Sequence, residues 1–274
     1  MTTASIGLSG GSKFFTLHFY YYNKNMENNS VKLRVISSSS AGNAYALDSG
    51  TEILLLEAGI RHSVMTRDVG FRDDKVVGCL ISHCHGDHAK YAEEYAKRGI
   101  HIYCNKDVRE KKRFPYGSYT EVQVMKTYDV GSFRICPFPL HHDVPNFAYL
   151  IHHPQMGTCL FALDTYKFDF SLENVDHFLI EANYDDKILK ANIQDGRIDR
   201  AQANRLMLSH MSLDNTNHFL QECHAETAKT ITLCHLSERN SDPDLFRRSV
   251  ESAFGIPCNI ARKGLVIELN KEVI

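Results

Sequence analysis

Short apolar segments separated by turn residues follow one another from about residue 31 and predict a mixed α/β fold. The segment KVVGCLIS at 75–82 is a continuous apolar run with the length of a strand buried on both faces. The segment HAKYAEEYAKRG at 88–99 predicts a helix that a glycine ends. Further strands are expected at 32–37, 52–59, 101–104, 121–127, 132–138, 147–152, 158–163, 178–182, 230–236 and 264–269, and further helices near 185–191, 214–223 and after Asp242-Pro243.

The first thirty residues differ from the rest in being polar and rich in Ser, Gly and Asn. We expect residues 1–30 to be a loosely ordered extension or the result of a misassigned start, with Met26 as the true one, followed by a single domain over 31–274. The chain shows no internal repeat and no Pro/Gly/Ser-rich linker after residue 45. Its 274 residues are enough to bury a sizeable core.

Composition excludes several classes of protein. The chain is 43% hydrophobic and 23% charged, which are ordinary globular values, and its formal net charge of −2 gives no basic footprint for a long nucleic-acid track. Its eight cysteines form no C-x-x-C pair, so we expect reduced thiols in a cytoplasmic protein. The apolar runs are too short for a membrane helix, and no signal peptide or membrane partner is expected.

The unusual feature of the composition is 15 histidines, three of which fall within six positions. His83, His85, Asp87 and His88 lie between the apolar run at 75–82 and the predicted helix. His83 and His85 alternate along an extended segment and point the same way, whereas Asp87 and His88 lie at the helix entrance and can serve a second centre. We expect Gly86 to permit the tight loop that this convergence needs. A solvated loop that caps the helix is the alternative, but a cap does not need three histidines.

This H-x-H-x-D-H segment resembles the signature of the metallo-β-lactamase-fold hydrolase superfamily. The resemblance implies an α/β fold of the αββα sandwich type, with a binuclear metal site at the edge of the two sheets. It also implies that later strand ends supply the remaining ligands, and such positions are present in the same order along the chain. The implied ligands are His83, His85 and His142 for the first metal, Asp87, His88 and His235 for the second, and Asp164 as the bridge between them.

Two of the neighbouring residues compete with these ligands. His141 and His142 are adjacent, so one of them faces away, and the family's ligand stands directly before an aspartate, which favours His142. Cys84 lies between two ligands but on the opposite face, so we expect a packed thiol.

The last ligand is left open between His235 and His210, because both histidines have apolar and serine neighbours. His235 is favoured because it follows the clearer strand, which leaves His210 near the site as a residue that contacts phosphate or as a helix-start residue. Asp164 has a strand-end turn as its alternative role, although a carboxylate at such a position can bridge two cations. We expect the histidines without a supporting spacing to be ordinary surface or core residues, namely His101, His152, His153, His177, His218 and His224.

Segments between the ligands are similar to a smaller group within the superfamily. SSSSAGNAY at 37–45, LLLEAGI at 54–60, IEANYD at 180–185 and HLSERNSDP at 235–243 resemble stretches of the small bacterial YycJ/WalJ-like subgroup of exonucleases and phosphoesterases. Glu57 departs from the aspartate usual in that subgroup, although a longer carboxylate can still orient a ligand imidazole. The resemblance spans residues 32 to about 269.

Other branches of the superfamily fit less well. The 71 positions from Asp164 to His235 are too few for the extra nuclease domain of the RNA-processing relatives. True lactamases lack an aspartate bridge, so Asp164 argues against antibiotic hydrolysis. A thioesterase similar to glyoxalase II stays as the least favoured alternative.

The expected function is a metal-dependent phosphodiesterase that acts on nucleic acids or nucleotides, most of all as a nuclease. Two divalent ions, Zn²⁺ or Mn²⁺, suit in-line phosphodiester hydrolysis by a hydroxide that bridges them. The alternative is a phosphodiesterase for cyclic or other small nucleotides, which the nearly neutral charge favours; a homodimer is left open. Catalytic roles are expected for Asp87 and His210, and substrate binding for Ser38, Asn43, Ser237 and Asn240, with a plain turn as the alternative for the serine run.

Overall fold

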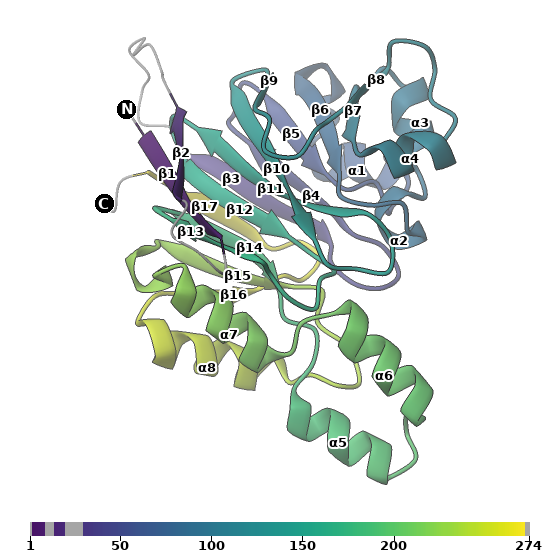
Figure 1. The fold of residues 1–274 in the computed structure, drawn as a ribbon. Coiled ribbons are helices and arrows are strands. Elements are labelled where there is room, and N and C mark those ends of the chain that lie inside the picture. The colour runs from purple at the N-terminus through teal and green to yellow at the C-terminus, as the bar shows by residue number, and fades with distance from the viewer. Residues whose placement is uncertain (1, 9–13, 20–29, 272–274) are drawn as a thin grey trace.

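The computed structural model describes residues 2–8, 14–19 and 30–271, which contain two large β-sheets that pack face to face (Figure 1). The first sheet has seven strands, with a parallel half that begins at β5 and antiparallel pairing on the other side. In the order of their hydrogen-bonded neighbours, these strands are β17 (Val266–Leu269), β3 (Val31–Ser37), β4 (Ala44–Asp48), β5 (Ile53–Leu56), β6 (Val76–Ile81), β7 (Ile102–Cys104) and β8 (Tyr119–Glu121).

The second sheet also has seven strands, and the later ones run parallel. Parallel strands begin at one edge and end at the other, so the loops after β12, β14 and β15 meet at the same edge. In order, the strands are β16 (Cys258–Ile260), β15 (Thr230–Cys234), β14 (His177–Glu181), β12 (Gly157–Ala162), β11 (Asn146–His153), β10 (Phe133–Leu140) and β9 (Tyr128–Val130).

A third, smaller sheet contains the described part of the N-terminal segment. Strands β1 (Thr2–Leu8) and β2 (Phe14–Phe19) pair antiparallel, and β1 also pairs with β13 (Phe170–Glu173). This differs from the loosely ordered extension that we expected, because the aromatic, β-prone run near residue 14 finds a partner strand. Residues 1, 9–13, 20–29 and 272–274 lie outside the described residues, and with them Met26, our expected start.

Helices cover both outer faces of the paired sheets. On the first sheet these are α1 (His62–Asp68), α3 (Ala92–Lys97) and α4 (Lys106–Lys111), and on the second α7 (Leu213–Glu222) and α8 (Pro243–Phe254). The expected αββα sandwich is therefore confirmed. The remaining helices are α2 (Gly86–Ala89), α5 (Asp186–Gln194), α6 (Arg200–Ser209) and the short 3₁₀ turns η1 (Asp73–Lys75) and η2 (Ala225–Thr227).

Strand β11 shows how the layers are held together, since it is buried on both faces. Tyr149 and Ile151 belong to the core between the sheets, whereas Ala148 and Leu150 belong to the core beneath α7 and α8. Alternate side chains of one strand therefore serve two different cores, which is why such strands are apolar throughout.

Of two predicted helices, one begins where its local sequence predicts, whereas the other is divided by a contact with a distant segment. Helix α8 begins as expected, because the Asp242 carboxylate accepts hydrogen bonds from the next turn and Pro243 occupies the first helical position. The helix expected over 88–99 is instead divided into α2 and α3. The Tyr91 amide donates to Ala58 O (2.9 Å), which is a bond to the loop after β5 that replaces a helical one.

The strand expected over 121–127 was also wrong in extent, because β8 ends at Glu121 and Met125 has a φ of 59° that no strand continues through. Among the described residues, none of the helices combines the length and apolar character needed to span a bilayer.

Candidate metal centre

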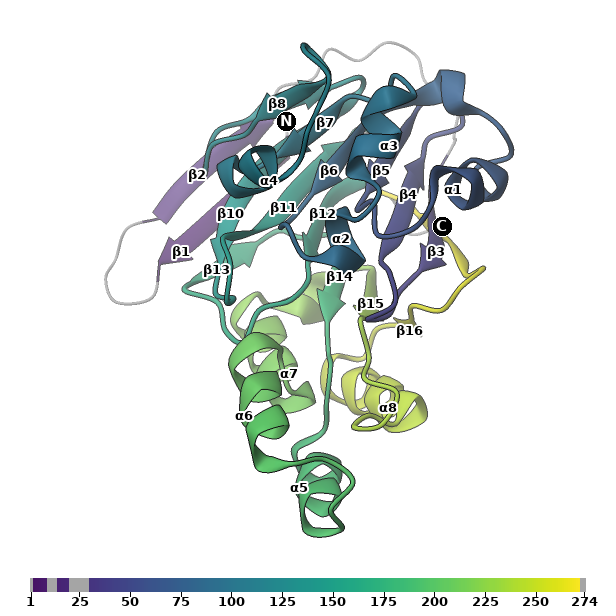
Figure 2. The same cartoon turned by 90° about the vertical axis from the view of Figure 1, so that its right-hand side faces the viewer.

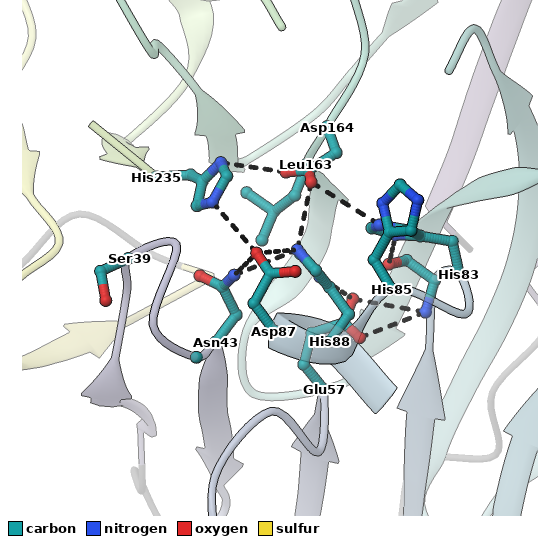
Figure 3. Close-up of polar contacts among 12 residues, drawn as sticks. Ser39, Asn43, Glu57, His83, His85, Asp87, His88, Leu163, Asp164 and His235 are labelled. Carbon is teal, nitrogen blue, oxygen red and sulfur yellow. Dashed lines mark hydrogen bonds and ion pairs between the residues drawn. The ribbon is translucent and has the colours of Figure 1, made fainter. Parts of the chain in front are cut away.

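The H-x-H-x-D-H segment forms the connection between β6 and α2, at the edge where the two sheets meet (Figure 3). His83 and His88 are buried, and Gly86 begins α2. The expectation that Gly86 permits a tight turn was wrong, because its φ is not left-handed and an added Cβ would meet no atom within 4 Å. The position at which the backbone is too close to its neighbour for a side chain is instead Gly59, where an ideal Cβ would lie 1.8 Å from Asp87 O.

Three carboxyl or imidazole groups of the site follow directly on strands and have left-handed backbone. The φ angles are 67° at Glu57 after β5, 55° at Asp164 after β12 and 55° at His235 after β15. Such angles are uncommon outside glycine and gather at functional sites. They turn each side chain out of the strand alternation and toward the motif, as Figure 3 shows.

A first set of metal-ligand atoms comes from both sheets. One such atom from each of His83, His85, His142 and Asp164 lies within 4.8 Å of the others. His83 Nε2 is 3.6 Å from Asp164 Oδ2, and His142 Nε2 is 3.2 Å from His85 Nδ1. These four are the three histidines and the bridging carboxylate that the sequence assigned to the first metal.

A second set shares the same aspartate. Asp87, His88, Asp164 and His235 also bring one ligand atom each within 4.8 Å. His88 Nε2 is 3.3 Å from Asp87 Oδ2 and 3.2 Å from Asp164 Oδ2, and His235 Nε2 is 3.5 Å from Asp87 Oδ2. Asp164 therefore lies between the two sets, where the sequence placed the bridge.

Protein groups behind the imidazoles fix their orientation. In four of the histidines one ring nitrogen faces an outer partner, so that Nε2 faces the centre. Outer partners of this kind set the tautomer and direction of metal-binding histidines. The pairs are His83 Nδ1 with Ser82 Oγ (2.9 Å), His88 Nδ1 with Glu57 Oε1 (3.5 Å), His142 Nδ1 with Ser209 O (3.1 Å) and His235 Nδ1 with Glu181 Oε1 (2.9 Å).

Burial and charge set the protonation of the first set. Burial lowers the pKa of His83 well below its ordinary value, and the neighbouring His88 lowers it further. Burial also lowers the pKa of His142. Burial would raise the pKa of Asp164, but His235 and His88 outweigh it and hold this pKa well below its usual range. Neutral imidazoles beside an ionised carboxylate are the protonation states that bind divalent metals.

The buried atoms of the site fit a pair of cations. His83 Nε2 and His235 Nε2 are buried and have no hydrogen-bond partner among the described residues. The carboxyl groups of Glu57, Asp164 and Glu181 are buried in the same region, and buried carboxylates are normally balanced by positive charge or metal. Nitrogen and oxygen donors of this kind suit zinc or manganese.

The two histidines that the sequence left as rivals for the last ligand position have different neighbours. His235 lies with Asp87 and His88, whereas His210 lies at the end of α6 with its Nδ1 2.6 Å from Glu181 Oε1. His210 Nδ1 is also 4.0 Å from Asp164 Oδ1, and His210, His235, Asp164 and Glu181 form a third set whose ligand atoms lie within 4.8 Å of one another. Sequence reasoning gave Glu181 no role, because nothing local to β14 shows that its carboxylate contacts both histidines.

The remaining rivals lie away from the centre. His141 pairs with Asp169 and contacts Tyr166, whose ring is tilted by 54° relative to the imidazole. Cys84 lies 3.3 Å from Lys111 Nζ and belongs to neither ligand set. Both placements agree with the preference for His142 and for a packed thiol.

The four expected substrate-binding residues have structural partners instead of an open rim. Ser38 Oγ accepts from Tyr45 OH (2.8 Å) and from His235 N (3.0 Å). Asn43 is buried beneath the site, with Nδ2 3.1 Å from His88 Nε2. Ser237 Oγ accepts from the backbone amide of Asn240, which is itself buried. Polar residue type alone did not reveal which of these hydroxyls and amides would face inward.

A hollow of about 320 Å³ opens directly over the donor sets. Its outer wall is one face of α6, which the sequence analysis did not predict as a helix. Figures 1 and 2 both show α5 and α6 projecting beyond the sheets on the side of the site. The lining residues are Ser40, His85, Asp87, His142, Asp143, Asp164, Gln202, Arg205, Leu206, Ser209, His210 and His235.

The layers, the shared aspartate and the histidine sets define a metal-dependent hydrolase of the metallo-β-lactamase fold. The chain is 26% identical to exodeoxyribonuclease WalJ of Streptococcus pneumoniae over 240 residues, which covers 78% of this chain and 84% of that protein. No family model matches the chain.

Solved structures agree on the fold. The metallo-β-lactamase-fold protein YhfI of Bacillus subtilis superposes with a TM-score of 0.68 at 21% identity, covering 88% of this chain and all of that one. Zn²⁺-bound PqqB of Methylobacterium extorquens superposes with a TM-score of 0.64 at 11% identity, covering 87% of this chain and 100% of that one. At these identities the likeness concerns the fold.

Proposed function

We propose that this chain is a binuclear metal-dependent phosphodiesterase that cleaves nucleic acids or nucleotides, with nuclease activity as its main form. The observation that carries this proposal is Asp164, whose carboxylate lies within 4.8 Å of both donor sets at the floor of an open hollow. The similarity to an exodeoxyribonuclease supports the choice of phosphodiester over thioester substrates.

Two divalent ions at this centre would lower the pKa of water and stabilise the charge of a phosphoryl group. The chain's own contribution is to hold the ligands, with His83, His85, His142 and Asp164 for one ion and Asp87, His88, His235 and Asp164 for the other. The outer partners keep those ligands in place, and the buried walls keep bulk water from screening the site.

His210 is the residue best placed to act as a proton donor to the leaving group. It lines the hollow, and the Glu181 carboxylate accepts a hydrogen bond from its Nδ1, which leaves Nε2 as the nitrogen free for substrate. An imidazole oriented by a carboxylate is a common arrangement for general acid–base catalysis.

A small or cyclic nucleotide is the second candidate substrate, favoured by one observation. The hollow over the metals is about 320 Å³, which is at the small end of the range for ligand pockets, and the chain has a formal net charge of −2.

The test begins with bis(p-nitrophenyl) phosphate in the presence of Mn²⁺ or Zn²⁺. We expect hydrolysis by the wild-type protein and its loss in Asp87→Ala, whereas Asp195→Ala, on the exposed end of α5, serves as the matched control. Hydrolysis of S-lactoylglutathione without any phosphodiesterase activity would contradict the proposal. End-labelled DNA and 3′,5′-cyclic nucleotides then separate the two candidates, and cleavage of the cyclic substrate alone would select the second.

A further inference from the structure

A second hollow lies beside the one over the metals, and Gln202 lines both of them. The second hollow has a volume of about 440 Å³. Its lining residues are Asn192, Arg197, Ile198, Gln202, Arg239 and Asn240. None of these residues belongs to either donor set, so the second hollow is a separate feature that adjoins the centre.

One face of α6 connects the two hollows. Gln202, Arg205, Leu206 and Ser209 recur at helical spacing and line the hollow over the metals, and Gln202 also lines the second hollow together with Ile198, which lies just before α6. The seven steps from Gln202 to Ser209 rise about 10 Å along the helix axis, which is the length of about three stacked nucleotides at ~3.4 Å each. The wall is therefore longer than one nucleotide.

The segment that contains α5 and α6 carries a net positive charge, whereas the chain as a whole does not. Residues 186–209 contain five Lys or Arg and three Asp, in a chain whose formal net charge is −2. Arg205 lines the first hollow and Arg239 the second, and within the described part of the chain neither side chain makes an ion pair. Arg197, by contrast, is held by Asn192 Oδ1 (2.7 Å) and by Asp195.

We propose that the second hollow binds the nucleotide next to the scissile phosphodiester, with Arg205 and Arg239 contacting backbone phosphates on either side of Gln202. The substrate is then a strand of at least two nucleotides, and a mononucleotide or cyclic nucleotide would leave half of the site empty. Arginine suits this role because its planar guanidinium binds phosphate oxygens in pairs. This inference rests on the proposed phosphodiesterase function and specifies its substrate.

The test compares a strand with a substrate too small to reach the second hollow. For Arg239→Ala we expect kcat/KM to fall about tenfold or more on an end-labelled single strand, mainly through KM, and to stay within about twofold on bis(p-nitrophenyl) phosphate. Arg200→Ala is the control, because Arg200 is an exposed arginine at the start of α6 that lines neither hollow. DNA and RNA strands are assayed in parallel, and a selective loss with either sugar supports the proposal.

Binding without turnover separates this inference from the function on which it rests. The anisotropy of a fluorescent strand, measured over a range of salt concentrations, should give a log–log slope that falls by about one for Arg239→Ala and is unchanged for Arg200→Ala. Equal losses on both substrates, or equal losses in Arg239→Ala and Arg200→Ala, would overturn the strand-binding role. Selective strand binding in a protein that hydrolyses neither substrate would instead overturn the phosphodiesterase function alone.

Discussion

Histidines gather at both ends of the second sheet, but only those at one end face one another. At the end where β12 and β15 stop, His142 and His235 join the motif histidines around Asp164. At the opposite end, His153 lies where β11 stops and His177 where β14 begins. Both groups are largely buried, and both contribute to the histidine excess of the composition.

The difference between the two groups lies in their partners. His177 Nε2 faces Met156 O (3.1 Å) and its Nδ1 faces Thr230 Oγ1 (2.9 Å), while His153 Nε2 faces Ser132 Oγ (3.0 Å). At the metal end His83 Nε2 and His235 Nε2 are buried without a hydrogen-bond partner among the described residues. The capacity to bind metal therefore depends on where such unpartnered ring nitrogens meet, and a count of histidines cannot reveal it.

The largest effect is expected when the carboxylate that joins the two donor sets is removed. Asp164→Asn should lower phosphodiesterase kcat/KM by about 10²–10³-fold, the scale seen when one preorganised polar group is lost from an active site. Metal content measured by mass spectrometry should fall in the same variant.

Asp176→Asn is the matched control at the other end of the sheet, where Asp176 contacts Thr158 N and Lys229 Nζ. Metal content should be unchanged in this control. If Asp164→Asn keeps the metal content and the activity of the wild-type protein, Asp164 does not join the two sets.

A backbone contact at the metal end gives the next largest effect. Gly59→Ala places a Cβ 1.8 Å from Asp87 O, so the loop that carries Asp87 must shift. We expect a loss of about 1–3 kcal/mol in the free energy of unfolding, the usual cost of overpacking, measured by urea denaturation. Gly86→Ala is the control, because its Cβ meets open space, and it should change stability by less than about 0.5 kcal/mol. Equal stability of the two variants would show that the motif loop does not depend on Gly59.

The effect that is smallest at neutral pH concerns acid stability and belongs to the opposite end. Burial lowers the pKa of His177 to about 4, below its value in the unfolded chain. As the pH falls below about 6.5, His177 binds a proton in the unfolded chain but not in the folded protein. This difference lowers the free energy of unfolding by up to about 1.4 kcal/mol per pH unit until the pKa of the folded protein is reached.

His177→Gln should therefore flatten the dependence of the unfolding free energy on pH between 6.5 and 4, measured on protein treated with chelator so that metal loss does not contribute. The exposed His218, replaced by Gln, is the control and should leave the slope unchanged. An unaltered slope in His177→Gln would mean that His177 titrates normally in the folded protein.

Much of the site could be predicted from the sequence because its ligands follow strands that are themselves easy to recognise. The apolar runs before His83, Asp164 and His235 mark strand ends, and parallel strands deliver their ends to one edge. The grouping of these residues came from the resemblance to the superfamily, whose ligands occur in the same order, and the structure brings the same residues together.

What could not be predicted depends on contacts between distant segments. Glu181 contacts His210 and His235, which lie 29 and 54 positions away, and no local pattern encodes that meeting. Helix α6 has charged and apolar residues without a clear stripe, so Arg205 was not recognised as part of the wall. Asn43 was placed at the rim for its polarity, but it is fully buried beneath His88.

The sharing of the centre between the two sheets has a consequence for how the protein comes apart. His83 and His88 follow a strand of the first sheet, whereas Asp164 and His235 follow strands of the second, about 150 residues apart at the extremes. A metal ion held by both would act as a cross-link that closes this long loop and ties the two halves of the sandwich together. Release of the metal and separation of the sheets would then be one event, so the lifetime of the bound metal would report how often the sandwich opens.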